Sequence, residues 1–240
     1  METQPPPNRA AESPAHRELK RLALLWAQTN GFRIAAAEVS LPQYRVRMDV
    51  AACKLERQGR ASGIGATAIF ECKASAPDFR RDAHGHAATL ERLEALHARR
   101  LRVEEELRLY YPSIRNGDSL FPEYETLNFE RPGYERYEVV MTQIRRLTAV
   151  LYEGTKFDRL AQQNVANLYY VVADPEVLRP HELPSGWGCL ERAGDSLVLT
   201  AKPHWHEVSE DSRSFFLQRI ALAGTRAVNR EHGVVLPPEG

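Results

Sequence analysis

Long hydrophobic runs are missing from this chain. Its longest apolar stretches, such as Leu22 to Ala27, are far shorter than the roughly 20 residues that a membrane-spanning helix needs. The first residues are polar and proline-rich, whereas a secretory leader is basic and then apolar. We therefore expect a cytoplasmic protein with no membrane partner.

Cysteine is scarce and net charge is absent. The three cysteines, Cys53, Cys72 and Cys189, form no CxxC pair and no even disulfide framework, which favours a reducing compartment. The 32 Lys and Arg residues balance the 32 Asp and Glu residues. Because phosphate neutralisation supplies most of the affinity of dedicated DNA-binding proteins, this balance counts against tight DNA binding. It leaves room for a local basic groove.

The composition is that of an ordinary globular protein, and the mixture of predicted helices and strands along the chain predicts an α/β fold. With 240 residues, 43% of them hydrophobic, the chain fits one globular domain with a substantial insertion or a small second unit. Segments with helical and strand periodicity are mixed along it. The predicted helices are 15–30, 156–165 and 211–228, and the predicted strands are 33–39, 44–53, 65–73, 167–173, 187–192 and 197–201. A loop rich in Gly and charge is predicted over 56–63.

The region 83–155 follows a different pattern. Apolar residues recur there at three- and four-residue spacing in two stretches crowded with Arg and Glu. This spacing predicts two long helices, packed as an antiparallel arm that is inserted into the domain. The expected plan is a disordered tail (1–14), a core (15–82 and 156–208), a helical insertion (83–155) and a C-terminal helix with its tail (209–240).

Three charged residues are expected to meet on the sheet. Glu71 and Lys73 are two apart in a predicted strand, so their side chains share a face, while Phe70 and Cys72 face the other way. Asp49, on the preceding strand, also points away from the apolar face. If these strands pair as an antiparallel hairpin, Asp49, Glu71 and Lys73 converge. Two carboxylates so close repel each other unless a cation lies between them.

These residue types suit phosphodiester hydrolysis. Mg²⁺ takes hard oxygen ligands, often only one or two carboxylates, together with water and substrate phosphate. A metal held there would polarise a phosphate and lower the pKa of bound water. Lys73 would orient that water and stabilise the charge that develops on phosphorus. The expected metal site is Asp49, Glu71 and Cys72, although the thiol of Cys72 is expected to pack in the core.

A family resemblance follows from these residues. The run Arg47-Met48-Asp49-Val50, followed by Ile69-Phe70-Glu71-Cys72-Lys73-Ala74-Ser75, resembles the D…ExK signature of the PD-(D/E)XK nuclease superfamily. The segments 75–82, 156–158, 167–172 and 182–188 resemble its MmcB-like DNA-repair branch and related phage proteins. The resemblance implies a restriction-endonuclease-like fold, in which helices flank a mixed central sheet. It also implies DNA as substrate and Mg²⁺ or Mn²⁺ as cofactor.

The resemblance also suggests further site residues. Some branches of the superfamily carry an additional Glu on the first helix, and Glu18 is the candidate for that catalytic position. Met48 stands before Asp49 where the signature has Pro, which is a common variation. Lys156, Arg80 and Arg81 are candidates for contacts to the phosphate backbone of a nucleic acid. A solvated helix face explains those three equally well.

We predict a metal-dependent nuclease that hydrolyses DNA phosphodiester bonds in repair, mobile-element or defence processes, with RNA left open as a substrate. The main alternative is a catalytically inactive nuclease-fold module that binds DNA or a protein partner through the helical arm. A third interpretation is a structural protein in which the arm forms a homodimer. Metal affinity, and its loss when Asp49 or Glu71 is changed, distinguishes the first two.

Overall fold

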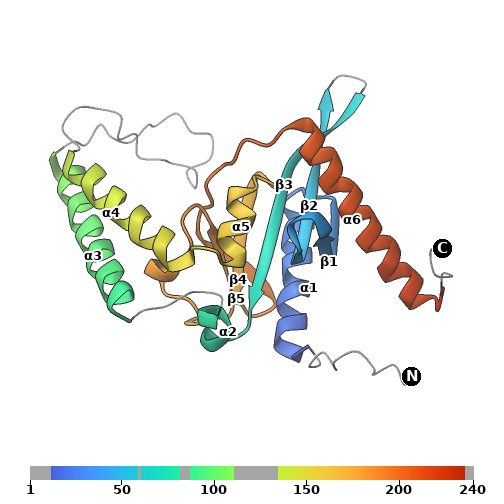
Figure 1. Ribbon diagram of the computed structural model, residues 1–240, viewed down its shortest axis with the longest axis horizontal. Coiled ribbons are helices and arrows are strands. Elements are labelled where there is room, and N and C mark those ends of the chain that lie inside the picture. Colours follow the sequence, from blue (N-terminus) through green and yellow to red (C-terminus); the bar gives the residue numbers. More distant parts are fainter. Residues whose placement is uncertain (1–11, 59–60, 82–86, 111–134, 236–240) are drawn as a thin grey trace, which may run out of the picture. The chain divides into compact units, whose positions relative to one another are not determined.

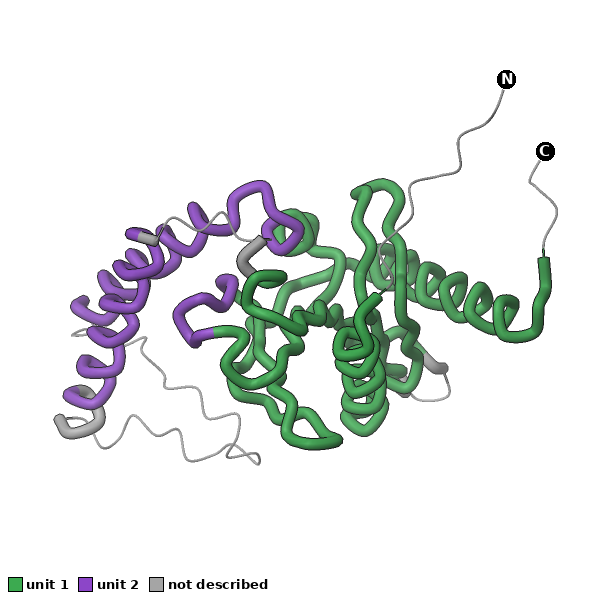
Figure 2. Tube along the Cα trace, turned by 90° about the horizontal axis from the view of Figure 1, so that it is seen from below, with its two compact units in different colours: residues 1–81, 159–178, 186–240 green, residues 82–158, 179–185 purple. Residues whose placement is uncertain are grey.

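The computed structural model describes residues 12–58, 61–81, 87–110 and 135–235. The chain divides into two compact units (Figure 2). The first consists of residues 1–81, 159–178 and 186–240, and the second of residues 82–158 and 179–185. Each unit is described by itself.

A six-stranded mixed sheet, whose strand order follows the chain, forms the centre of the first unit. The strands are β1 (Ile34–Leu41), β2 (Val46–Gln58), β3 (Ala61–Lys73), β4 (Leu168–Ala173), β5 (Gly188–Ala193) and β6 (Ser196–Ala201). The first three pair antiparallel, β4 runs parallel to β3, β5 runs parallel to β4, and β6 returns antiparallel to β5. The predicted α/β class and mixed sheet are confirmed (Figure 1).

Helices flank this sheet. They are α1 (Pro14–Thr29), α2 (Ala76–Arg81), α5 (Lys156–Gln162) and α6 (Glu210–Glu231), and η1 (Pro42–Tyr44) is a short 3-10 turn between β1 and β2. The hydroxyl of Ser13 caps α1 by accepting the backbone N–H of His16 at 3.2 Å, and Pro14 occupies the first turn. The helix ends before Gly31, whose φ of +88° suits glycine. The tail predicted over 1–14 lies mostly outside the described residues, and its last residue already belongs to α1.

The core between α1 and the sheet is aromatic at its centre. The apolar stripe of α1 (Leu19, Leu22, Ala23 and Ala27) is buried against β2, β3 and β4. Phe70 of β3 stacks on Tyr170 of β4 with ring centroids 5.1 Å apart, and Trp26 and Phe32 meet Phe70 edge-on. Cys72 belongs to the same core, as its position in the strand predicts. This packing holds α1 and the β2–β3 hairpin together.

The predicted hairpin of β2 and β3 is confirmed, but its loop is much shorter than predicted. The two strands remain paired through Arg57 and Ser62 as far as Gln58 and Ala61. Residues 56–58 and 61–63 therefore continue the two-stranded ribbon. Backbone hydrogen bonds hold such a ribbon whatever its side chains, so composition alone wrongly predicted a loop.

The second unit contains the two long helices predicted for 83–155. They are α3 (Ala87–Tyr110) and α4 (Glu135–Tyr152), which run antiparallel beside each other (Figure 1). Their buried apolar residues include Leu93, Leu96, Val140, Ile144 and Leu151. The 3-10 turn η4 (Pro180–Glu182) contacts α3, and the hydroxyl of Tyr152 donates a hydrogen bond to the carbonyl oxygen of Glu182.

Acid is expected to weaken the second unit through His97. Burial, aided by the charge of Arg100 and by His181, lowers the pKa of His97 from 6.5 to about 4. The folded state favours neutral His97. Its contribution to the free energy of unfolding is therefore complete above pH 6.5 and is lost as the pH falls towards 4. Because His97 is partly exposed and solvent screens its charge, we expect this loss of stability to be about 1 kcal/mol by pH 5.

His97→Gln should remove this part of the pH dependence. Hydrogen exchange of the α3 and α4 amides at pH 7 and pH 5 would measure it in both proteins. The wild-type helices should lose more protection than the variant helices on acidification. Equal losses would show that His97 does not link this unit to pH.

Candidate active site

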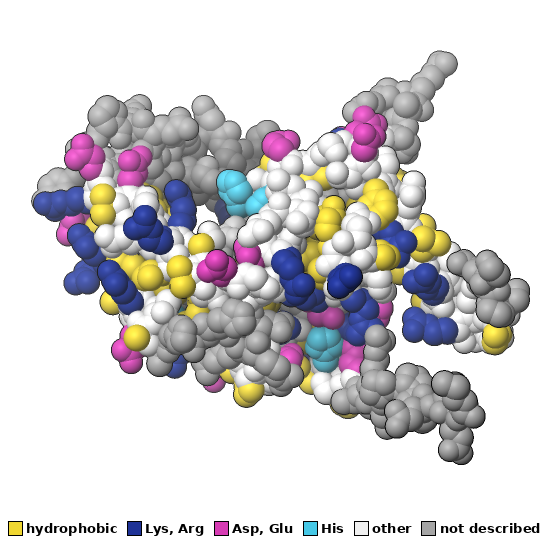
Figure 3. Space-filling view, viewed as in Figure 1, with side chains coloured by type: hydrophobic (Ala, Val, Ile, Leu, Met, Phe, Trp, Pro, Cys, Tyr) yellow, Lys and Arg dark blue, Asp and Glu magenta, His cyan; other side chains and the backbone are white. Residues whose placement is uncertain are grey.

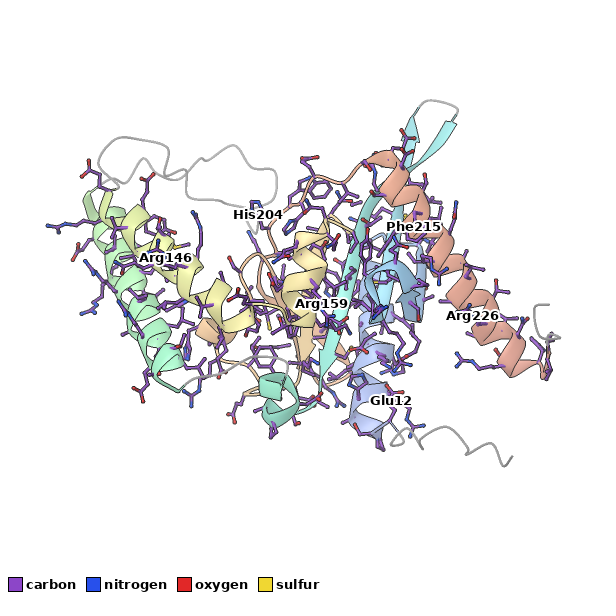
Figure 4. The ribbon with its side chains drawn as sticks, in the orientation of Figure 1. Glu12, Arg146, Arg159, His204, Phe215 and Arg226 are labelled. Carbon is purple, nitrogen blue, oxygen red and sulfur yellow. The ribbon has the colours of Figure 1, made fainter. Side chains whose placement is uncertain are left out.

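An open cavity of about 1420 Å³ lies in the first unit. The start of α1, the second half of β1, the start of β2, the segment after β3 and the last turns of α6 surround it. Its charged lining residues are Glu12, His16, Lys20, Glu38, Arg47, Asp49, Asp78, Arg226 and Arg230. Glu12 lies just before α1 and Arg226 lies in the second half of α6 (Figure 4). Of the predicted catalytic residues, Asp49 lines this cavity.

Asp49 is fixed at the end of the paired part of the hairpin. The regular pairing of β2 with β3 reaches Val50 and Phe70, and Asp49 and Glu71 are the next residues at that end. There Oδ2 of Asp49 accepts the backbone N–H of Cys72 at 2.8 Å. This hydrogen bond stands where the next backbone pair of the two strands would be. It attaches the Asp49 carboxylate to Cys72, the residue between Glu71 and Lys73.

Glu71 and Lys73 lie deeper than expected. Their exposed fractions are 1% and 7%, whereas the side chain of Asp49 is 15% exposed. Neither is among the described residues that line the cavity. Buried charges require interactions to offset their desolvation, and each of these two residues has at least one interaction with another group. The structure therefore places Asp49 at the cavity and Glu71 and Lys73 in buried positions, and the convergence of the three side chains on a metal stays a prediction.

The pKa of the Cys72 thiol reflects its burial and the charges around it. Its pKa is raised well above the ordinary value, first by burial and then by the charges of Asp49 and Glu71. Lys20 and Lys73 oppose that rise. A thiol that is buried in an apolar core and held protonated is a poor metal ligand. The core position of Cys72 does not favour its thiol as a ligand, and its inclusion in the metal site stays a prediction. In the structure, the backbone N–H of Cys72 positions Asp49.

Sequence reasoning missed two residues of α1 at this site. His16 and Lys20 lie one turn apart and share a helix face. Nε2 of His16 is 3.4 Å from Oδ1 of Asp49, and Nζ of Lys20 is 3.9 Å from the same oxygen. The hydrogen bond to Asp49 raises the pKa of His16 against the opposing effect of burial. The signal available in the sequence was their four-residue spacing beside the apolar stripe.

The Lys20 ammonium also gathers two further carboxylates. It contacts Oε1 of Glu12 at 2.5 Å and forms a close ion pair with Glu38. Burial alone would lower the pKa of Lys20, but hydrogen bonds to Glu12 and Glu38 outweigh burial and raise it. One ammonium therefore neutralises much of the negative charge that surrounds Asp49.

Glu38 has an unusual backbone for a strand residue. Its φ is +58°, in the left-handed region that side chains other than glycine rarely adopt. Ala37 pairs with Val50, so Glu38 stands opposite Asp49 across β1 and β2. Its carboxylate also accepts Nε of Arg47 at 2.8 Å. Such a conformation costs on the order of 1–3 kcal/mol and is concentrated at functional sites.

Glu18 does not join this cluster, contrary to the prediction. Its carboxylate oxygens are 2.9 and 2.7 Å from Nε and Nη2 of Arg21, on the same helix. That pairing is the main reason why the pKa of Glu18 is lowered. Two residues along a helix correspond to about 200° of rotation, so Glu18 lies on another side from His16.

The three candidates for phosphate contacts remain predictions. Arg80 and Arg81 end α2, and their side chains lie outside the described part of the structure. Lys156 is the first residue of α5 and belongs to the second unit.

The donors around Asp49 are chemically suited to a hard cation. Carboxylate oxygens are the ligands that Mg²⁺ and Mn²⁺ prefer. Among the described residues, no three His, Cys, Asp or Glu side chains are already grouped as a metal site. In this conformation the carboxylates of Glu12, Glu38 and Asp49 gather around Lys20 instead.

Comparisons with known proteins inform the fold alone. None of the described helices is both long and apolar enough to span a bilayer. No protein-family model matches the chain, and no curated protein matches it either. A solved structure from Silicibacter pomeroyi, the SPO1766 protein of unknown function, is similar with a TM-score of 0.50 and 14% sequence identity. The match covers 96% of this chain and 100% of that chain, and at this identity it shows a shared fold.

Proposed function

We propose that this chain is a metal-dependent nuclease of the PD-(D/E)XK type that hydrolyses DNA phosphodiester bonds. The observation that carries the proposal is the hydrogen bond between Asp49 and the N–H of Cys72. It holds one predicted ligand against the strand that bears Glu71 and Lys73, beside an open and highly charged cavity.

The topology supports the same proposal. A mixed sheet flanked by helices is the arrangement that the restriction-endonuclease-like resemblance implies. On this interpretation α3 and α4 are a helical arm inserted into a nuclease core. The MmcB-like resemblance extends the proposal to a role in DNA repair or in phage biology.

Each residue has a distinct role in the proposed reaction. Asp49 and Glu71 would hold Mg²⁺ or Mn²⁺, which supplies a water of lowered pKa and polarises the phosphate. Lys73, two residues from Glu71 on the same strand face, would orient that water and stabilise negative charge on the phosphate oxygens. His16 and the N–H of Cys72 keep the Asp49 carboxylate in place.

A cleavage assay tests the proposal. Labelled single-stranded, duplex and flapped DNA would be incubated with the wild-type protein and Mg²⁺, Mn²⁺ or EDTA. We expect cleavage that requires the metal and that falls at least about 10²-fold in Lys73→Met, which keeps the aliphatic stem but loses the ammonium. Lys202→Met, which removes an exposed lysine just after β6, is the matched control and should retain activity.

One observation favours a second candidate function. Glu71 and Lys73 are almost completely buried, and Lys20 already neutralises the carboxylates beside Asp49. A nuclease-fold module that has lost catalysis, and that binds DNA or a protein partner through α3 and α4, would have these properties. Wild-type protein that binds DNA but cuts no substrate with either metal would replace the nuclease proposal with this one.

A further inference from the structure

We propose that the last turns of α6 form the phosphate-binding wall of the cavity that contains Asp49. Arg226 and Arg230 would hold the sugar–phosphate backbone of a DNA strand while it passes the carboxylate. This inference rests on the proposed nuclease function and names how its substrate is held.

The position of α6 is firmly set. Phe216, Ile220 and Ala223 are buried, and α6 packs mainly against β1. Arg219 adds a hydrogen bond from Nε to the carbonyl oxygen of Ser40 at 2.8 Å. An anchored helix presents the side chains of its last turns at a defined place, which binding of an extended ligand requires.

Arg226 and Arg230 lie on the cavity side of this helix. They are four residues apart and therefore neighbours on one helix face. Both line the cavity, and so does Asn229 between them. Arginine side chains, drawn in dark blue, are visible on the last turns of α6 in Figure 3, and Arg226 is labelled on this helix in Figure 4. A row of two guanidinium groups and an amide suits successive phosphate oxygens.

Arg226 and Arg230 differ from the other cations of the cavity in their ion pairing. Lys20 and Arg47 are ion-paired with carboxylates at the inner wall. Within the described ranges, no ion pair includes Arg226 or Arg230. Exposed guanidinium groups that face an open cavity across from carboxylates attract anionic ligands.

The size and lining of the cavity favour a polymer over a small molecule. At about 1420 Å³ it exceeds the roughly 300–1,000 Å³ of drug-sized sites. Such small-molecule sites are mostly apolar, whereas half of the residues that line this cavity are charged residues or histidine. A DNA strand that lies between the arginines and Asp49 would place one of its phosphates against the proposed metal site.

Fluorescence anisotropy measures whether the α6 wall binds DNA, under conditions in which no cleavage occurs. The full chain would be titrated with labelled single-stranded and duplex DNA in EDTA at several salt concentrations. Arg226→Gln/Arg230→Gln should bind about tenfold more weakly near 100 mM salt. Its plot of log affinity against log salt should be shallower by about 1–2 units, as expected for two lost phosphate contacts. Arg33→Gln/Lys202→Gln removes two exposed charges outside the cavity and is the matched control.

The outcomes separate this inference from the proposed function. Weaker binding and a shallower slope in the α6 variant alone, with a raised KM and an unchanged kcat in the cleavage assay, would support it. An α6 variant that binds like the wild type, or no more weakly than the control variant, would overturn it. Metal-dependent cleavage that still requires Lys73 would leave the nuclease proposal standing in that case. Wild-type protein that neither binds nor cuts DNA would overturn both.

Discussion

Asp49→Asn is expected to abolish metal-dependent cleavage while the protein remains folded. Asparagine keeps an oxygen that can accept the N–H of Cys72, so the 2.8 Å bond at the end of the hairpin has a replacement. The negative charge needed to hold a divalent cation is lost. We expect kcat/KM to fall at least about 10²-fold, because the metal stabilises both the attacking water and the phosphate charge.

Binding and folding measurements complete this test. Mn²⁺ titration should show weaker metal binding by the variant, and circular dichroism should show an unchanged fold. Asp195→Asn, in the exposed turn between β5 and β6, is the same chemical change far along the sheet and should leave cleavage intact. If Asp49→Asn cuts DNA as fast as the wild type, Asp49 does not hold the metal and the site assignment fails.

Phe70→Ala is expected to cost about 3–5 kcal/mol of unfolding free energy. The ring is 0% exposed, stacks on Tyr170 at 5.1 Å and has Trp26 and Phe32 against its edges. Removing it leaves a cavity at the junction of α1, β3 and β4, which well-packed neighbours fill only partly. Urea denaturation followed by tryptophan fluorescence would measure the loss.

Leu55→Ala provides the comparison for this prediction. Leu55 lies on β2 with 50% of its surface exposed, and its truncation should cost well under about 1 kcal/mol. A loss for Phe70→Ala as small as that for Leu55→Ala would mean that α1 does not depend on this aromatic cluster for its attachment. The positions of His16 and Lys20 beside Asp49 would then lack their structural explanation.

The strand-level features of the site were predictable because they depend on local periodicity. Two-residue spacing alone places Glu71 and Lys73 on one strand face and Cys72 in the core. The hairpin followed from two strands separated by a short polar segment. The depth of Glu71 was not predictable, because burial depends on which elements pack against the strand. One element that contacts β3, α6, begins more than a hundred residues later in the sequence.

The site residues that α1 supplies could not be predicted from the sequence for a different reason. Its apolar stripe is evident from the sequence, but polar residues flank that stripe on both sides. Which flank meets the open end of the sheet depends on how the helix crosses the strands, and this is a tertiary property. Glu18 and His16 were therefore equivalent candidates in sequence. The left-handed backbone of Glu38 carried no signal, because Glu has no preference for that conformation.

The order of the strands has a consequence for the protein as it leaves the ribosome. All the proposed ligands, together with His16, lie before the end of β3 at Lys73, but the parallel partner of β3 begins only at Leu168. At translation rates of roughly 5–20 residues per second, one side of β3 has no strand beside it for on the order of 5–20 s. An unpaired strand edge is a site of misassociation between nascent chains. The segment with Glu71 and Lys73 is thus open to such misassociation until β4 has been synthesised.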